Sequence, residues 1–264
     1  MTIVDTAKQA LWKKSGLAPD HKGYVTDIER NLLPGVTPEM IKDDYLKGSG
    51  HEWKGKFRAI HSSSALAANT FGRWKTEPAL LTFAGYTGFD KLELEAKCPT
   101  GLGGTPPNLD VLLKSTDTLI GIESKLLEPL TPTTPKFSAS YSRDRLPLCD
   151  DIWWALLEKQ MQQPSASHLD TAQLIKHYLG LRKNFSDHKN VLLVYIFWKP
   201  LNADKFEEYS RHAEALETFS RAVQHSETIR FIALDYLQLW DAWEKDRNMA
   251  EHAKLLKDRY CVEI

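Results

Sequence analysis

The stretch Asn108-Leu109-Asp110-Val111-Leu112-Leu113 is followed, after a short polar turn, by Leu119-Ile120-Gly121-Ile122-Glu123-Ser124-Lys125. Both are apolar runs of strand length, and the turn at residues 115–117 predicts that they form a hairpin. Side chains on a strand alternate between the two faces of a sheet, so Glu123 and Lys125 point the same way. The first strand brings a further acid, Asp110, to the same part of the hairpin.

These three charged side chains indicate a particular chemistry. Two carboxylates side by side repel each other unless a positive charge lies between them. A divalent metal ion together with a lysine satisfies this requirement, and hard cations such as Mg²⁺ prefer oxygen ligands. The combination is typical of metal-assisted phosphodiester hydrolysis. We therefore expect a metal site at one end of the hairpin.

Composition and charge are those of an ordinary globular protein. The 264 residues are 42% hydrophobic and 26% charged, which suits one large domain. The net charge of −1 gives no general attraction for nucleic acid, so such a partner has to meet a local basic patch. The three cysteines form no CxxC, which argues against a structural zinc site and a disulfide framework. No apolar run is long enough for a membrane span or a signal peptide, so we expect a cytoplasmic protein without a membrane partner.

The order of predicted elements favours an α/β fold with a central sheet. The nearly continuous apolar run at residues 190–198 is typical of a strand that is buried on both faces. Residues 52–74 have a mainly helical pattern after a break at Gly48-Ser49-Gly50, and residues 1–46 predict helical segments broken by glycines and prolines. A sheet with helices on both sides buries this pattern best. The remaining predicted strands are 91–96, 109–114, 118–126 and 229–234, and the remaining helices are 150–162, 170–184, 206–223 and the segment that ends near Tyr260.

The motif and the element order together resemble the PD-(D/E)xK nuclease superfamily. Its restriction-endonuclease-like fold has an αβββαβ core with a mixed sheet flanked by helices. Asp110 matches the first acid, Glu123 the second and Lys125 the lysine, whereas Leu109 stands where the family name implies Pro. The segment 50–74, which begins Gly50-His51-Glu52-Trp53, looks like the N-terminal helix of a bacterial subgroup.

The resemblance covers about residues 50–200 and implies a single nuclease domain over residues 1–264. Residues 1–49 would then be an N-terminal helical extension, and residues 201–264 a C-terminal helix-strand-helix extension. The implied activity is that of an endonuclease that depends on Mg²⁺, with Mn²⁺ as a substitute. The expected substrate is a nucleic acid, and DNA is the one that the resemblance favours. Restriction-like enzymes often dimerise to cut two strands, so a homodimer is among the implied assemblies.

Within this resemblance each site residue has a role. Asp110, Glu123, the backbone carbonyl of Ser124 and Glu52 would hold one or two metal ions. Lys125 would orient or help to deprotonate the attacking water and stabilise charge on the phosphate. Gln173 on the helix 170–184 would lend a polar side chain to the site without binding the metal itself.

Each role has a plainer alternative. Asp110 can be a solvated residue near a turn, although Asp is depleted in strand interiors. Glu123 and Lys125 can form an ordinary salt bridge. Glu52 can be a first-turn acid that favours the helix dipole, and Gln173 can belong to an exposed helix face. Glu77 and Glu95 are weaker candidates for the site. Strand alternation allows Glu95 to face solvent.

Basic and small polar residues suggest where a nucleic acid would lie. Ser62-Ser63-Ser64 and His61 can donate hydrogen bonds to a phosphate, or can simply fill space where a helix packs closely. Charge runs are usually solvated faces, but clustered arginines and lysines also contact phosphates. The candidates for such contacts are Lys56, Arg58, Arg73, Arg143 and Arg145.

Two rival functions stay open at this point. The first is a non-catalytic module that binds nucleic acid or a protein on the same fold, and the second is a metal-dependent hydrolase of small phosphoesters. The intact set of Asp110, Glu123 and Lys125 argues against the first rival. The chain has no GxxxxGK[ST] and no GxSxG motif, which argues against a P-loop and a nucleophile elbow.

Overall fold

The computed structural model describes residues 1–48 and 51–264. These residues fold around one five-stranded sheet. The strands lie side by side in chain order, antiparallel across the first three and parallel from the third to the fifth. The expected mixed sheet is therefore confirmed. The strands are β1 (Lys91–Lys97), β2 (Asn108–Lys114), β3 (Thr118–Lys125), β4 (Asn190–Phe197) and β5 (Arg230–Asp235).

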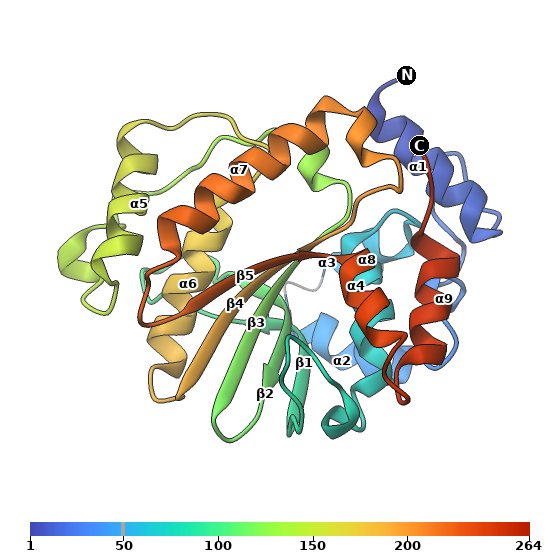
Figure 1. Cartoon of the computed structure of the whole chain (residues 1–264), viewed down its shortest axis with the longest axis horizontal. Coiled ribbons are helices and arrows are strands. Elements are labelled where there is room, and N and C mark those ends of the chain that lie inside the picture. The colour runs from blue at the N-terminus through green and yellow to red at the C-terminus, as the bar shows by residue number, and fades with distance from the viewer. Residues whose placement is uncertain (49–50) are drawn as a thin grey trace.

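Helices cover both faces of this sheet, as the element order predicts (Figure 1). One face is covered by α5 (Asp151–Gln162), α6 (Thr171–Phe185) and α7 (Glu207–Val223). The elements of the other side are α1 (Ile3–Ser15), α2 (Pro38–Lys47), α3 (His51–Lys54), α4 (Ser63–Phe71), α8 (Tyr236–Trp243) and α9 (Ala250–Tyr260). The chain ends meet on this second side, where α1 packs against α9.

β4 shows how the sequence pattern produces the two layers. Alternate residues of the strand enter different hydrophobic cores, Leu192 and Val194 on one face and Leu193 and Tyr195 on the other. All four are almost completely buried, and burial of each such side chain contributes about 1.5–3 kcal/mol. The prediction of a strand buried on both faces is thus confirmed.

The segment 52–74 differs from the mainly helical expectation. It forms the short helix α3, a 3-10 turn at Lys56–Arg58, an extended stretch and then α4. The reason is that the extended stretch bonds to residues 23–25: Val25 N donates to Arg58 O and Ile60 N to Gly23 O, both at 3.0 Å. The predicted break at 48–50 lies partly outside the described residues, and the division into extensions and core stays a prediction.

The feature of the sheet that matters most for the site is a split between β2 and β3. Pairing of these two strands ends at Val111 and Ile122, whereas β2 stays paired with β1 as far as Asn108. Asp110 lies at the split, and its carboxylate accepts a hydrogen bond of 2.7 Å from the backbone N–H of Ser124 on β3. The carboxylate of Asp110 therefore accepts from the N–H of Ser124, in place of the backbone carbonyl of β2 that would accept it if the strands stayed paired.

Candidate active site

A cavity of about 550 Å³ opens at the split between β2 and β3. It collects most of the predicted site residues from separate elements: Asp110 from β2, Glu123 from β3 and Glu52 from α3. Its residues are Tyr24, Glu52, Lys56, Ala59, His61, Ser62, Ser63, Ser64, Glu95, Pro106, Asn108, Asp110, Glu123, Ser124, Lys125, Glu128 and Gln173.

On the side of the cavity next to α6, charges are paired. Glu123 and Lys125 form an ion pair on the face of β3 that alternation predicts, and Glu123 is almost completely buried. Lys125 Nζ also donates to Gln173 Oε1 at 2.7 Å. The structure therefore brings Gln173, which was expected to support the site in general, into direct contact with Lys125.

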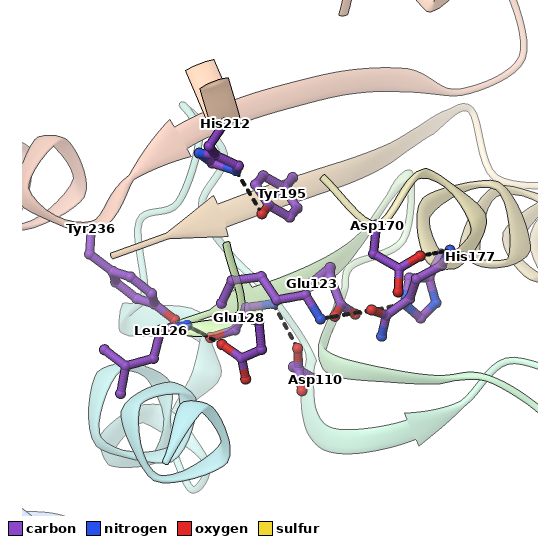
Figure 2. A network of polar contacts seen from close by, with 12 residues as sticks. Asp110, Glu123, Leu126, Glu128, Asp170, His177, Tyr195, His212 and Tyr236 are labelled. Atoms are coloured by element: carbon purple, nitrogen blue, oxygen red, sulfur yellow. Dashed lines mark hydrogen bonds and ion pairs between the residues drawn. The ribbon is translucent and has the colours of Figure 1, made fainter. Parts of the chain in front are cut away.

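His177 completes this side and was missed by the sequence analysis. Its Nε2 lies 2.6 Å from Glu123 Oε2 (Figure 2). The imidazole is fully buried. His177 follows Gln173 by one helical turn, and residues four apart lie on the same helix face. That spacing is the signal in the sequence that points to it, once Gln173 has been placed at the site.

The electrostatics of this pair decide the protonation of Lys125. Burial alone lowers the pKa of Lys125, but the charges of Glu123, Glu128 and Asp110 outweigh burial and hold the pKa above its usual value. Burial likewise raises the pKa of Glu123, and the positive charge of Lys125 with the contact to His177 more than reverses it. Lys125 is thus a fixed cation, which disfavours the alternative in which it acts as a base.

On the side next to β1, burial outweighs the charge of Lys125 and the hydrogen bond from Ser124 N, which lower the pKa of Asp110. Burial raises the pKa of Asp110 well above its usual value, and the charges of Glu123 and Glu95 raise it further. Burial also raises the pKa of Glu95 to about 7, against a hydrogen bond of 3.3 Å from Asn108 Nδ2 that lowers it. Within the described residues, neither Asp110 nor Glu95 has an ion-pair partner.

Glu95 corrects an expectation from strand alternation. Alternation allows this weaker candidate to face solvent, but it lies in the wall of the cavity. Its backbone has a φ of 50°, which is uncommon for a residue other than glycine and interrupts the regular alternation of β1. The pairs Leu94–Val111 and Ala96–Leu109 on either side place Glu95 opposite Asp110. Glu77 is exposed and is not part of the cavity.

Glu52 and the small polar residues lie in the wall formed by the segment 52–64. Glu52 accepts a long hydrogen bond of 3.5 Å from Ser64 Oγ and is 3.9 Å from Lys56 Nζ. Ser62 caps α4, because its Oγ accepts from Ala65 N at 3.2 Å. The helix α3 has only four residues, so a dipole role for Glu52 has little support.

The predicted basic residues divide into two groups. Lys56 lines the cavity with a largely exposed side chain. Arg58, Arg73, Arg143 and Arg145 lie outside it, and three of them have contacts elsewhere. Arg58 Nη1 donates to Thr26 O at 3.3 Å, Arg73 lies 3.8 Å from Glu251, and Arg143 lies 2.5 Å from Asp151. Contact of these four with phosphates stays a prediction.

Comparison with known proteins places the chain in a family. Residues 6–261 match the sequence model of a family described as "Restriction Endonuclease associating with ARP". The chain belongs to this family. Its description indicates a nuclease of the restriction-endonuclease type, and hence nucleic acid as the substrate. No curated protein and no solved structure matches the chain. Within the described residues, no helix is long and apolar enough to cross a membrane.

The donor set of the cavity fits a hard divalent cation. Five carboxylic acids and two lysines line it, so acidic groups outnumber cationic ones, and oxygen ligands are those that Mg²⁺ prefers. No three His, Cys, Asp or Glu side chains within the described ranges form a ready-made metal group. Lys125 and His177 contact both oxygens of Glu123, but a carboxylate has further lone pairs to offer.

Proposed function

We propose that this chain is a PD-(D/E)xK nuclease of the bacterial subgroup and cuts DNA with Mg²⁺, for which Mn²⁺ can substitute. The observation that carries the proposal is the position of Asp110 and Glu123 at the split between β2 and β3, with Lys125 beside them. Asp110, Glu123 and the carbonyl of Ser124 would hold the cation. Glu52 and Glu95 line the same cavity and would complete the set of ligands.

The residues have complementary tasks in this proposal. When bound, Mg²⁺ supplies a water of lowered pKa and neutralises charge on the leaving oxygen. Lys125, which its acidic neighbours keep protonated, donates to a phosphate oxygen and stabilises negative charge there. Gln173 fixes the ammonium group of Lys125, and His177 fixes the carboxylate of Glu123.

A cleavage assay tests this proposal directly. Purified protein is incubated with supercoiled circular DNA, linear duplex DNA, single-stranded DNA and RNA, with Mg²⁺, with Mn²⁺ or with EDTA. We expect nicking or linearisation of the circle only when a metal is present, because an endonuclease needs no free end. An Asp110→Asn variant that cuts as fast as the wild type would show that the activity comes from another site or from a contaminant.

The family description favours a second element of function, which is assembly with a partner. It describes a restriction endonuclease that associates with ARP, and we propose that this chain supplies hydrolysis within such an assembly. Co-expression with an ARP protein, followed by size-exclusion chromatography, tests the association. The same column shows whether the chain alone is the homodimer that restriction-like enzymes often form. A non-catalytic module that binds nucleic acid or a protein would leave every substrate of the cleavage assay intact under any metal condition.

A further inference from the structure

The N-terminal arm, defined as residues 20–25, builds part of the cavity wall although it lies far from the motif in sequence. It runs antiparallel to residues 58–60, with an isolated bridge between Tyr24 and Ala59. Asp20 holds the arm in shape, because its carboxylate accepts from Lys22 N at 2.8 Å and from Tyr24 N at 3.0 Å. Tyr24 and, just after the paired stretch, His61 both line the cavity.

Trp12 of α1 is fitted against this arm. Gly23 has a φ of +86°, and a Cβ at this position would come within 2.2 Å of the indole ring of Trp12. A side chain at residue 23 is therefore excluded both by the backbone conformation and by Trp12. The indole in turn contacts His61: Trp12 Nε1 donates to His61 Nδ1 at 3.2 Å, and the ring centroids are 6.0 Å apart.

This contact fixes the tautomer of His61. The indole N–H can only donate, so Nδ1 of His61 has to accept, and the hydrogen of the neutral imidazole is on Nε2. Burial, together with the charge of Lys8, lowers the pKa of His61 to about 4 against the opposing effect of Glu128. Near neutral pH His61 is thus an uncharged donor. Within the described part of the chain, no residue accepts a hydrogen bond from its Nε2.

We infer that His61 binds the strand to be cut by donating its Nε2–H to a phosphate oxygen, with Trp12 as the positioning residue that fixes the donor. The inference rests on the proposed function. A neutral donor suits this cavity because the carboxylates compete for any cation, as the approach of Lys56 to Glu52 at 3.9 Å illustrates. Tyr24 meets the imidazole edge-on with centroids 6.4 Å apart and is a second aromatic ring that limits its movement.

The test measures binding separately from cleavage. Fluorescence anisotropy gives the Kd of a labelled DNA oligonucleotide for the full chain, with Ca²⁺ in place of Mg²⁺ so that binding is measured apart from cleavage. We expect His61→Ala to weaken binding roughly tenfold, as for one hydrogen bond to a charged group. His61→Gln, whose amide nitrogen can take the place of Nε2, should restore most of the affinity. Trp12→Phe, which keeps an aromatic ring but removes the donor, should weaken binding by a smaller factor.

Controls separate a phosphate contact from a merely structural role. His225→Ala removes an exposed histidine outside the cavity and should leave Kd unchanged. The titration of Glu95 changes the Kd of every variant between about pH 6 and pH 8. The ratio of the Kd of His61→Ala to that of the wild type should stay constant over this range, because the neutral ring of His61 does not titrate there. Thermal unfolding confirms that each variant is folded.

Two results would overturn the inference while leaving the nuclease proposal intact. One is a wild type that binds and cuts DNA while His61→Ala binds equally well. The other is a folded His61→Gln variant that binds as weakly as His61→Ala, which would indicate packing and not a donor. A wild type that neither binds nor cuts any nucleic acid with any metal would remove the nuclease proposal, and this inference with it.

Discussion

The two sides of the cavity hold the same kind of residue in opposite electrostatic states. On the side next to α6, Glu123 has Lys125 and His177 as partners, and its pKa is held below the usual value. On the side next to β1, Asp110 and Glu95 have raised pKa values. The difference teaches where the protein itself stabilises an ionised carboxylate and where the proposed cation would have to do so.

Among these variants, Lys125→Ala should have the largest effect on the rate of cleavage, because it removes the ammonium group from the side next to α6. We expect cleavage with Mg²⁺ to fall by about 10³-fold, since a preorganised donor to the transition state is lost. Initial rates of circle nicking measure the effect. Lys114→Ala, at the exposed far end of β2, is the matched control and should cut like the wild type. Equal rates for both variants would remove Lys125 from the chemistry.

A smaller loss of cleavage rate is expected from His177→Asn. This variant removes the imidazole that contacts Glu123 and leaves all the acids of the cavity in place. The expected loss of activity or metal affinity is about 10–100-fold, as for other residues that orient a metal ligand. The measurement is cleavage rate as a function of Mn²⁺ concentration. Full activity at every metal concentration would mean that Lys125 alone holds Glu123, and that the contact to His177 only fills the core.

Glu95→Gln sharpens the comparison through the pH dependence of stability. The pKa of Glu95 is about 7 in the folded protein, above the value for an exposed glutamate, so the folded state binds this proton more tightly than the unfolded state. This contribution to stability is complete below the unfolded pKa and is lost as the pH rises through about 7. Metal-free Tm measured at about pH 5 and pH 8 should therefore fall less in Glu95→Gln than in the wild type. Parallel curves for the two proteins would contradict the raised pKa.

The smallest effect on activity is expected from Ser124→Ala. Its hydroxyl lies 2.6 Å from the buried Tyr236 OH, away from the acids, whereas its backbone carbonyl is the proposed ligand. The variant should lose about 1 kcal/mol of stability, because Tyr236 is left unpaired, but should keep its cleavage rate. Chemical unfolding and a cleavage assay measure the two effects. A large loss of rate with intact folding would assign the hydroxyl, and not the carbonyl, to the site.

Much of the fold follows from local patterns in the sequence. The predicted strands and the helices over α5, α6 and α7 agree with the structure to within one residue at their ends, because period-two and helical patterns directly reflect which face is buried. Alternation on β3 also predicts that Glu123 and Lys125 share a face. The segment 52–74 is the exception, since its backbone bonds to residues 23–25, which lie far from it in sequence.

The parts of the site that were predicted only weakly, or not at all, depend in most cases on similar long-range contacts or on unusual backbone. Glu95 enters the cavity through a positive φ that no pattern of polar and apolar residues signals. His177 was within reach, because it lies one turn from Gln173. The contact between Trp12 and His61 spans 49 residues and requires Gly23, so the sequence alone gives no reason to connect them.

Direct titration of a metal tests the central claim that the carboxylates at the split between β2 and β3 hold a divalent cation. Isothermal calorimetry of Mn²⁺ into the full chain is carried out at about pH 8, where the pKa of Glu95 no longer favours its protonated form. We predict saturable binding to the wild type and a loss of that binding in Asp110→Asn. Absence of metal binding to the folded wild type, or equal binding to both proteins, would contradict the account.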